Sequence, residues 1–133
     1  MAEGDTLVNA VIGAVVNVVA GAFLPFGPLF GGAAAGYLEG GSREAGLKVG
    51  AIAGMIALVP LFLFLTLFGG LVFAILAGGS MGGGLPMGFP MAAGGFGFVV
   101  IVLLLFGAVY IVGLSAVGGY LGNYVKYDTD VDI

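Results

Sequence analysis

The feature that most constrains this chain is the length of its uncharged segments. Val49 to Val125 contains no Asp, Glu, Lys, Arg or His, and neither does Thr6 to Leu38. Each segment is longer than the ~20 apolar residues that one membrane-spanning helix requires. Because only 8% of the residues are charged and 61% are hydrophobic, the polar surface is too small to cover a soluble globule of 133 residues. The sequence therefore predicts an integral membrane protein in contact with the lipid bilayer.

We expect the membrane-spanning elements to be helices. In lipid a strand is stable only within a closed barrel, which requires alternating side chains along each strand, and this chain shows no such alternation. Prolines, glycines and charged residues delimit about four helices: residues 6–24, 28–39, 43–77 and 96–125. The sequence thus predicts an all-α integral membrane protein with a single transmembrane domain over residues 1–133, a loop at 78–95 and an acidic tail at 126–133.

The first apolar segment contains a break. As one straight helix, Thr6 to Leu38 would be about 50 Å long against a hydrocarbon layer of ~30 Å. Pro25 removes a backbone donor, Gly27 permits unusual dihedral angles, and Pro28 fits the first turn of a new helix. We interpret a turn here, so that the helices form two hairpins, with a second arm short enough to be a candidate for a re-entrant segment. The alternative is three spans with a kinked first helix.

Glycines spaced by four residues are the clearest motif of the chain. At this spacing they lie on one helix face, where the missing side chains allow another backbone to come into van der Waals contact. This pattern predicts glycine-zipper packing, although with 28 glycines some of these spacings also arise by chance. The positions predicted to pack against a helix, of this chain or of another copy, are Gly32, Gly36, Gly40, Gly46, Gly50, Gly54, Gly118 and Gly122.

A polar stripe accompanies the glycines on the first helix, where Asn9 and Asn17 lie on the same face as Gly13. An Asn side chain in hydrocarbon needs an amide or carbonyl partner, and hydrogen bonds of this kind between helices are worth about 0.6–2 kcal/mol. We therefore expect both Asn side chains to face protein and to join helices. The alternative is a polar lining for a pore or substrate path, to which Thr66 and Ser115 would contribute.

Two residue types that are common in enzyme active sites are missing. The chain has no Cys and no His, which removes thiolate metal sites, the usual general base and a Ser-His triad. It has no GxxxxGK[ST] phosphate loop, and its net charge of -4 disfavours a nucleic-acid partner. The spacing of Met87 and Met91 is similar to that in copper transporters, but Pro90 disfavours the helix that would align the two sulfurs. We expect no enzymatic activity, no cofactor and no metal site.

The three basic residues indicate the orientation, because Lys and Arg are enriched in cytoplasmic loops. Arg43, Lys48 and Lys126 flank the ends of apolar helices, which predicts that both regions are cytoplasmic and that the loop at 78–95 is outside. The amino terminus is also cytoplasmic if the first segment turns back, and it is outside if that segment crosses once. The expected location is the cytoplasmic membrane, in a multi-pass arrangement.

The segment around the polar turn resembles a known family. Its residues are Gly-Gly-Ala-Ala-Ala-Gly-Tyr-Leu-Glu-Gly-Gly-Ser-Arg at 31–43, followed by Gly-Leu-Lys-Val-Gly-Ala at 46–51. This arrangement is similar to the small glycine-rich membrane proteins common in haloarchaea that are classed as a domain of unknown function. The similarity is clearest over residues 13–60 and again near 118–121. It implies an archaeal cell membrane and no known activity, and it supplies no catalytic residues.

These observations favour one function class over another. We expect a non-enzymatic structural or accessory membrane protein that forms homo-oligomers or joins a membrane complex through its glycine-rich helix faces. A small membrane pore or transporter is the alternative. Flux of a solute through reconstituted protein would distinguish the two.

Overall fold

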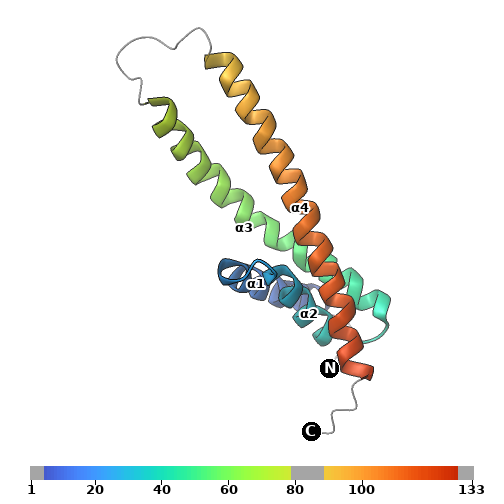
Figure 1. Ribbon diagram of the computed structural model, residues 1–133. Coiled ribbons are helices and arrows are strands. Elements are labelled where there is room, and N and C mark those ends of the chain that lie inside the picture. Colours follow the sequence, from blue (N-terminus) through green and yellow to red (C-terminus); the bar gives the residue numbers. More distant parts are fainter. Residues whose placement is uncertain (1–4, 79–88, 129–133) are drawn as a thin grey trace. The chain divides into compact units, whose positions relative to one another are not determined.

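The regular secondary structure of the described residues is helical. The computed structural model describes residues 5–78 and 89–128, which contain four helices: α1 (Thr6–Phe23), α2 (Gly27–Glu39), α3 (Arg43–Gly78) and α4 (Phe89–Asp128) (Figure 1). Three helical stretches are long and apolar enough to cross a membrane: Thr6–Phe23, Arg43–Gly69 and Gly97–Asp128. The prediction of an all-helical protein with helices able to span a membrane is therefore confirmed.

The last helix differs most from its expected bounds. α4 begins at Phe89 rather than at residue 96 and ends at Asp128 rather than at residue 125. Part of the expected loop and the start of the expected tail are thus helical. Pro90 is compatible with this early start, because the first turn of a helix makes no use of the N–H that proline lacks. The rest of the expected loop, with Met87 in it, lies outside the described residues.

Local sequence signals explain where the other helices begin. Pro28 occupies the first turn of α2, as expected for a residue without a backbone donor. The Ser42 hydroxyl accepts a hydrogen bond of 3.2 Å from the Ala45 backbone N–H, which caps the start of α3. α3 continues through Pro60, which lies inside the helix and leaves one carbonyl without its usual partner. The predicted starts of α2 and α3 agree with these bounds to within a residue.

The chain divides into two compact units. Unit 1 contains Met1–Val59 and Ala108–Ile133, and unit 2 contains Pro60–Gly107. Both α3 and α4 are divided between the two units.

Unit 1 has a core of very small side chains. Its buried hydrophobic residues are mainly alanines, with Val49 the largest of the fully buried side chains. Small residues allow helices to approach closely, which is how helices associate where burial of apolar surface gives no driving force. α1 and α2 run antiparallel, since Gly27 lies against Gly21 at one end and Glu39 contacts Thr6 at the other.

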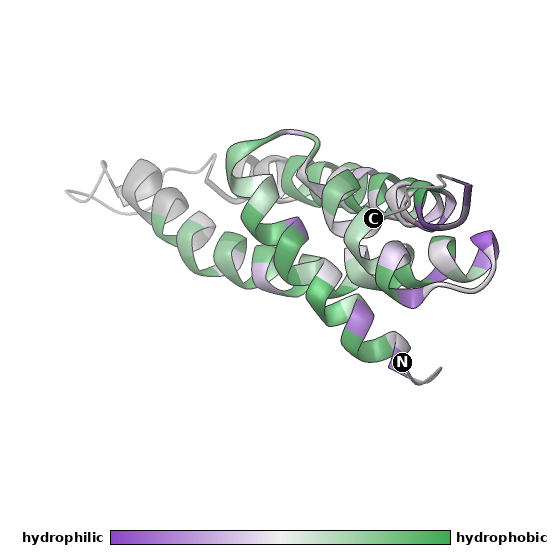
Figure 2. Ribbon diagram, turned by 90° about the horizontal axis from the view of Figure 1, so that it is seen from below, coloured by the Kyte–Doolittle hydropathy of each residue, from purple (hydrophilic) through white to green (hydrophobic). Residues whose placement is uncertain are grey.

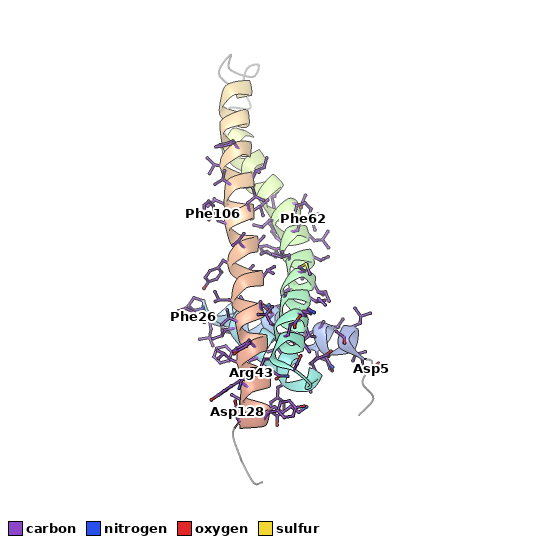
Figure 3. All side chains as sticks on the ribbon, turned by 90° about the vertical axis from the view of Figure 1, so that its right-hand side faces the viewer. Asp5, Phe26, Arg43, Phe62, Phe106 and Asp128 are labelled. Carbon is purple, nitrogen blue, oxygen red and sulfur yellow. The ribbon has the colours of Figure 1, made fainter. Side chains whose placement is uncertain are left out.

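In the described part of unit 2, the helices expose mainly apolar side chains. Phe62 and Phe106 are more than half exposed and point away from their helices (Figure 3). The rings of Phe64 and Phe68 stack with their centroids 4.4 Å apart. The Thr66 hydroxyl donates to the carbonyl of Phe62 in the same helix, so this polar group is satisfied without water. The composition of this surface suits a hydrocarbon environment.

Candidate functional site

The first close contact joins α1 to α2 and α3. A Cβ placed on Gly13 would lie 2.5 Å from the Cβ of Ala35 on α2 and 3.1 Å from that of Ala53 on α3. A Cβ placed on Gly31 would lie 2.6 Å from the Cα of Asn17. Real Cβ atoms essentially never come within 3.0 Å of another heavy atom in this way. The backbones of α1 and α2 therefore lie directly against each other, and glycine is required on both sides.

The second contact joins α2 to α4. A Cβ on Gly32 would overlap the Ser115 carbonyl oxygen and lie 2.6 Å from its carbon. A Cβ on Gly36 would meet the carbonyl group of Gly119 in the same way, again 2.6 Å from the carbon. The two predicted glycines of α2 thus face the backbone of α4, with no side chain between the two helices.

The contact between α2 and α4 is reciprocal. A Cβ on Gly118 would lie 2.9 Å from the carbonyl carbon of Leu29, and one on Gly122 would lie 2.8 Å from that of Ala33. Residue numbers rise together along both helices, so α2 and α4 run parallel at this contact. Each helix presents glycines to the carbonyl groups of the other.

The third contact joins α3 to α4, which run antiparallel here. A Cβ on Gly46 would lie 2.6 Å from the Cβ of Asn123, and one on Gly54 would lie 2.9 Å from the Cα of Val112. Between them, Gly50 faces the backbone near Ser115. All three glycines of this series therefore lie on the α4 side of α3.

Gly119 is the position where the second and third contacts meet. It lies against Gly36 of α2 and also against α3, where a Cβ on it would be 2.9 Å from the Cα of Gly50. Gly119 is not part of the predicted glycine series, but with Ser115 and Asn123 it repeats the four-residue spacing of the polar stripe on the first helix. Gly31 was also missed. The sequence could have indicated this position, because Gly27, Gly31 and Ala35 are small residues spaced by four.

Gly40 differs from the other members of its predicted series. It is the C-cap of α2 rather than a residue on a helix face, and its φ of 67° lies in the left-handed region that favours glycine. A Cβ at this position would also lie 2.9 Å from the Tyr127 hydroxyl and 3.0 Å from the Lys126 ammonium nitrogen. Glycine is needed here for the turn between α2 and α3.

Polar side chains join the same helices by hydrogen bonds. The buried Ser115 hydroxyl donates to the Gly50 carbonyl at 2.7 Å, which links α4 to α3. The Asn123 amide, also buried, donates to the carbonyl of Gly40 at 2.8 Å. Each bond satisfies a backbone carbonyl with a side chain from another helix. Groups of this kind are expensive to leave unpaired in a medium without water.

The two asparagines predicted on α1 have different surroundings. The Asn9 amide donates to the Glu39 carboxylate at 2.8 Å, and the Thr6 hydroxyl donates to the other oxygen of the same carboxylate. These bonds hold the start of α1 against the end of α2. Asn17 is buried against Gly31, and its amide nitrogen has no hydrogen-bond partner in the described part of the chain.

Charged and aromatic side chains gather where α3 begins and α4 ends. The Arg43 guanidinium pairs with the Asp128 carboxylate at 2.7 Å and lies 5.1 Å from the centre of the Tyr124 ring (Figure 3). The Lys126 ammonium lies 5.6 Å from the centre of the Tyr37 ring. Tyrosine and basic residues are typical of membrane–water boundaries. Hydrophilic positions are few elsewhere along the described helices (Figure 2).

The described residues contain no group of three or more His, Cys, Asp or Glu side chains that could hold a metal ion. The Ser115 and Thr66 hydroxyls are engaged in hydrogen bonds to carbonyl groups. What the arrangement provides is close contact between helices.

Comparison with known proteins gives a family but no activity. No curated protein and no solved structure matches the chain. A family model described as a family of unknown function (DUF5518) matches residues 7–125, which is most of the chain. The chain therefore belongs to the family of unknown function DUF5518.

Proposed function

We propose that this chain is a non-enzymatic structural or accessory protein of the membrane that assembles with further copies or with a larger membrane complex. The observation that carries the proposal is the use of its polar side chains. Ser115, Asn123 and Asn9 all bond across helix contacts within unit 1. These three side chains thus serve to hold helices together.

The glycine series support a protein built on helix packing, but they change where a partner would bind. The sequence pattern predicts that the glycine faces bind a partner, but Gly32, Gly36 and Gly50 already face helices of the same chain. We infer that the glycine zipper stabilises the protomer, arranged as two hairpins. Partners then bind on the outer surface, which is apolar and where glycines such as Gly113 meet nothing within 4 Å.

A pore or transporter is the second candidate, and one observation favours it. The buried Asn17 amide nitrogen has no hydrogen-bond partner among the described residues, as expected of a polar group that lines a path for water. Against it, Asn9, Thr66 and Ser115 have hydrogen-bond partners within the chain. We therefore assign Asn17 to helix packing.

The proposed location is the cytoplasmic membrane of an archaeal cell, with a multi-pass topology. The resemblance to glycine-rich proteins of haloarchaea supports the archaeal origin. Arg43 and Lys126 lie at neighbouring helix ends within unit 1, which supports a common cytoplasmic side for both.

Two measurements test the proposal. Light scattering of the protein in a mild detergent, with identification of co-purifying proteins, should give an oligomer or a complex larger than one chain. A strictly monomeric protein without companions would contradict the assembly function. In proteoliposomes we expect no selective solute flux, and selective flux abolished by Asn17→Leu would establish the pore instead.

A further inference from the structure

α2 is shorter than the hydrocarbon layer of a membrane. Its 13 residues give a length of about 20 Å, whereas the hydrocarbon layer is ~30 Å thick. One end of the helix is marked by Glu39, whose carboxylate is held by Thr6 and Asn9 at the start of α1. If this polar end lies at the membrane surface, the opposite end at Gly27 is about 20 Å from that surface, and α1, although long enough by itself to cross a membrane, ends beside it.

α4 gives a second, independent estimate of this depth. The Tyr110 hydroxyl donates to the carbonyl of Pro25 in the α1–α2 turn at 2.8 Å. Tyr110 lies about 24 Å along the helix from Lys126, at a rise of 1.5 Å per residue. Within unit 1, the turn therefore lies about 24 Å from the level of Lys126, which is less than the ~30 Å of the hydrocarbon layer.

The backbone of the turn is adapted to a place without water. Pro25 and Pro28 have no N–H to satisfy. The N–H groups of Leu24, Gly27 and Leu29 donate to carbonyls within the turn and the end of α1, at 2.8–3.0 Å. With the Pro25 carbonyl paired to Tyr110, the N–H of residue 26 is the one backbone donor of 24–29 without an acceptor in the described chain. Backbone at membrane depth has no water to pair with, so its polar groups must be satisfied within the protein.

The side chains of the turn are apolar and uncovered. Phe23 is 83% exposed and Phe26 is 60% exposed, and Leu24 between them is half exposed. A turn at the aqueous surface would carry polar residues, because they stabilise exposed turns. This turn has none between Phe23 and Pro28. Its outer surface has the chemistry of a contact with lipid chains.

We propose that α1 and α2 form a re-entrant pair whose turn, Leu24–Phe26, ends inside the hydrocarbon layer and contacts lipid acyl chains. Both ends of the pair then lie on the same side of the membrane. This depth of the turn is compatible with both an assembly protein and a pore.

Site-directed spin labelling measures that depth directly. The chain contains no cysteine, so Phe26→Cys and Phe23→Cys each give a single labelling site in liposomes. Val15→Cys is the matched control within α1, since Val15 is 58% exposed, and Ser42→Cys is the aqueous control. We expect the label at Phe26 to be accessible to oxygen and protected from a water-soluble nickel complex, as at Val15.

Two results would overturn the proposal. Access of the nickel complex at Phe26, equal to that at Ser42, would place the turn at the far aqueous surface. Protection from both oxygen and nickel at Phe26 and Phe23 would show that protein, such as a second copy, covers the turn.

Tyr110→Phe gives a second readout that does not depend on labelling. In hydrocarbon the Pro25 carbonyl would lose its partner, so the unfolding temperature in liposomes should fall. If the turn were in water, solvent would replace the hydroxyl and the unfolding temperature would stay unchanged, against the proposal. Val109→Ala, at the exposed neighbouring position, controls for loss of side-chain contacts on α4.

Discussion

Replacing Gly50 by alanine adds one methyl group at the contact between α3 and α4. Its Cβ would overlap the carbonyl oxygen of Ser115 and lie 3.0 Å from the Cα of Gly119. Because these are backbone atoms, no side-chain rotation relieves the overlap, and the two helices have to separate. The Ser115 hydroxyl then loses its 2.7 Å hydrogen bond to the Gly50 carbonyl.

The size of the effect follows from comparison with Gly113→Ala, where the new Cβ meets nothing within 4 Å. Both variants gain a similar helix propensity of up to ~1 kcal/mol, which cancels between them. Overpacking costs about 1–3 kcal/mol, and a hydrogen bond between membrane helices is worth about 0.6 kcal/mol. Gly50→Ala should therefore be less stable than Gly113→Ala by roughly 1.6–3.6 kcal/mol.

Reversible unfolding of both variants in the same mixed micelles measures this difference. Relative to the parent protein, Gly50→Ala should be less stable and Gly113→Ala equally or slightly more stable. If Gly50→Ala proves as stable as Gly113→Ala, the close approach of α3 and α4 at Gly50 is refuted.

Three further predictions concern the polar residues and the topology. Asn123→Leu should lower the free energy of unfolding by about 1–3 kcal/mol, because the carbonyl that ends α2 stays buried without its donor; an unchanged value would contradict that hydrogen bond. Asn17→Leu should leave the free energy of unfolding unchanged or raise it, because the amide nitrogen has no partner to lose; a loss above about 1 kcal/mol would reveal a partner or a bound water. Single cysteines at Ser42 and Thr129 should react with an impermeant maleimide from the cytoplasmic side and one at Ser80 from outside, and labelling of positions 42 and 80 from the same side would reject the topology.

The uncharged segments were sufficient to predict helices, because hydrocarbon leaves the backbone few ways to satisfy its own polar groups. The start of α4 could not be predicted in the same way. Glycine-rich sequence with Pro90 is typical of a loop in water, but the structure has a helix from Phe89 because proline fits its first turn. Propensities measured in water therefore misplace helix ends in an apolar chain.

The spacing of glycines identified positions on a helix face but not the helix that lies against it. Gly46 and Gly54 face α4, and Gly32 also faces α4, from a different side. A periodicity of four contains no information about the partner helix, which depends on how three helices fit together. Spacing also included Gly40, although α2 has already ended at Glu39 and the glycine serves the turn.

The hydrogen bonds of the site were predictable as types of interaction but not as pairs. Asn9 was expected to join helices, and it does so through Glu39, the charged last residue of α2. Tyr110 was not singled out at all. Nothing in its local sequence indicates that its hydroxyl reaches the carbonyl of Pro25, because that contact depends on how far along α4 the shorter α2 lies.

The contact between α2 and α4 within one chain can be tested by crosslinking a double variant. The Lys126 ammonium lies 5.6 Å from the centre of the Tyr37 ring, and both residues are exposed. A short bis-maleimide added to membranes containing Tyr37→Cys with Lys126→Cys should link the two cysteines within a single chain, giving a monomer of altered mobility in a denaturing gel. Crosslinked dimers without the intrachain product would show that the glycine faces of α2 and α4 join different copies, and would contradict the packing of α2 on α4 inside one protomer.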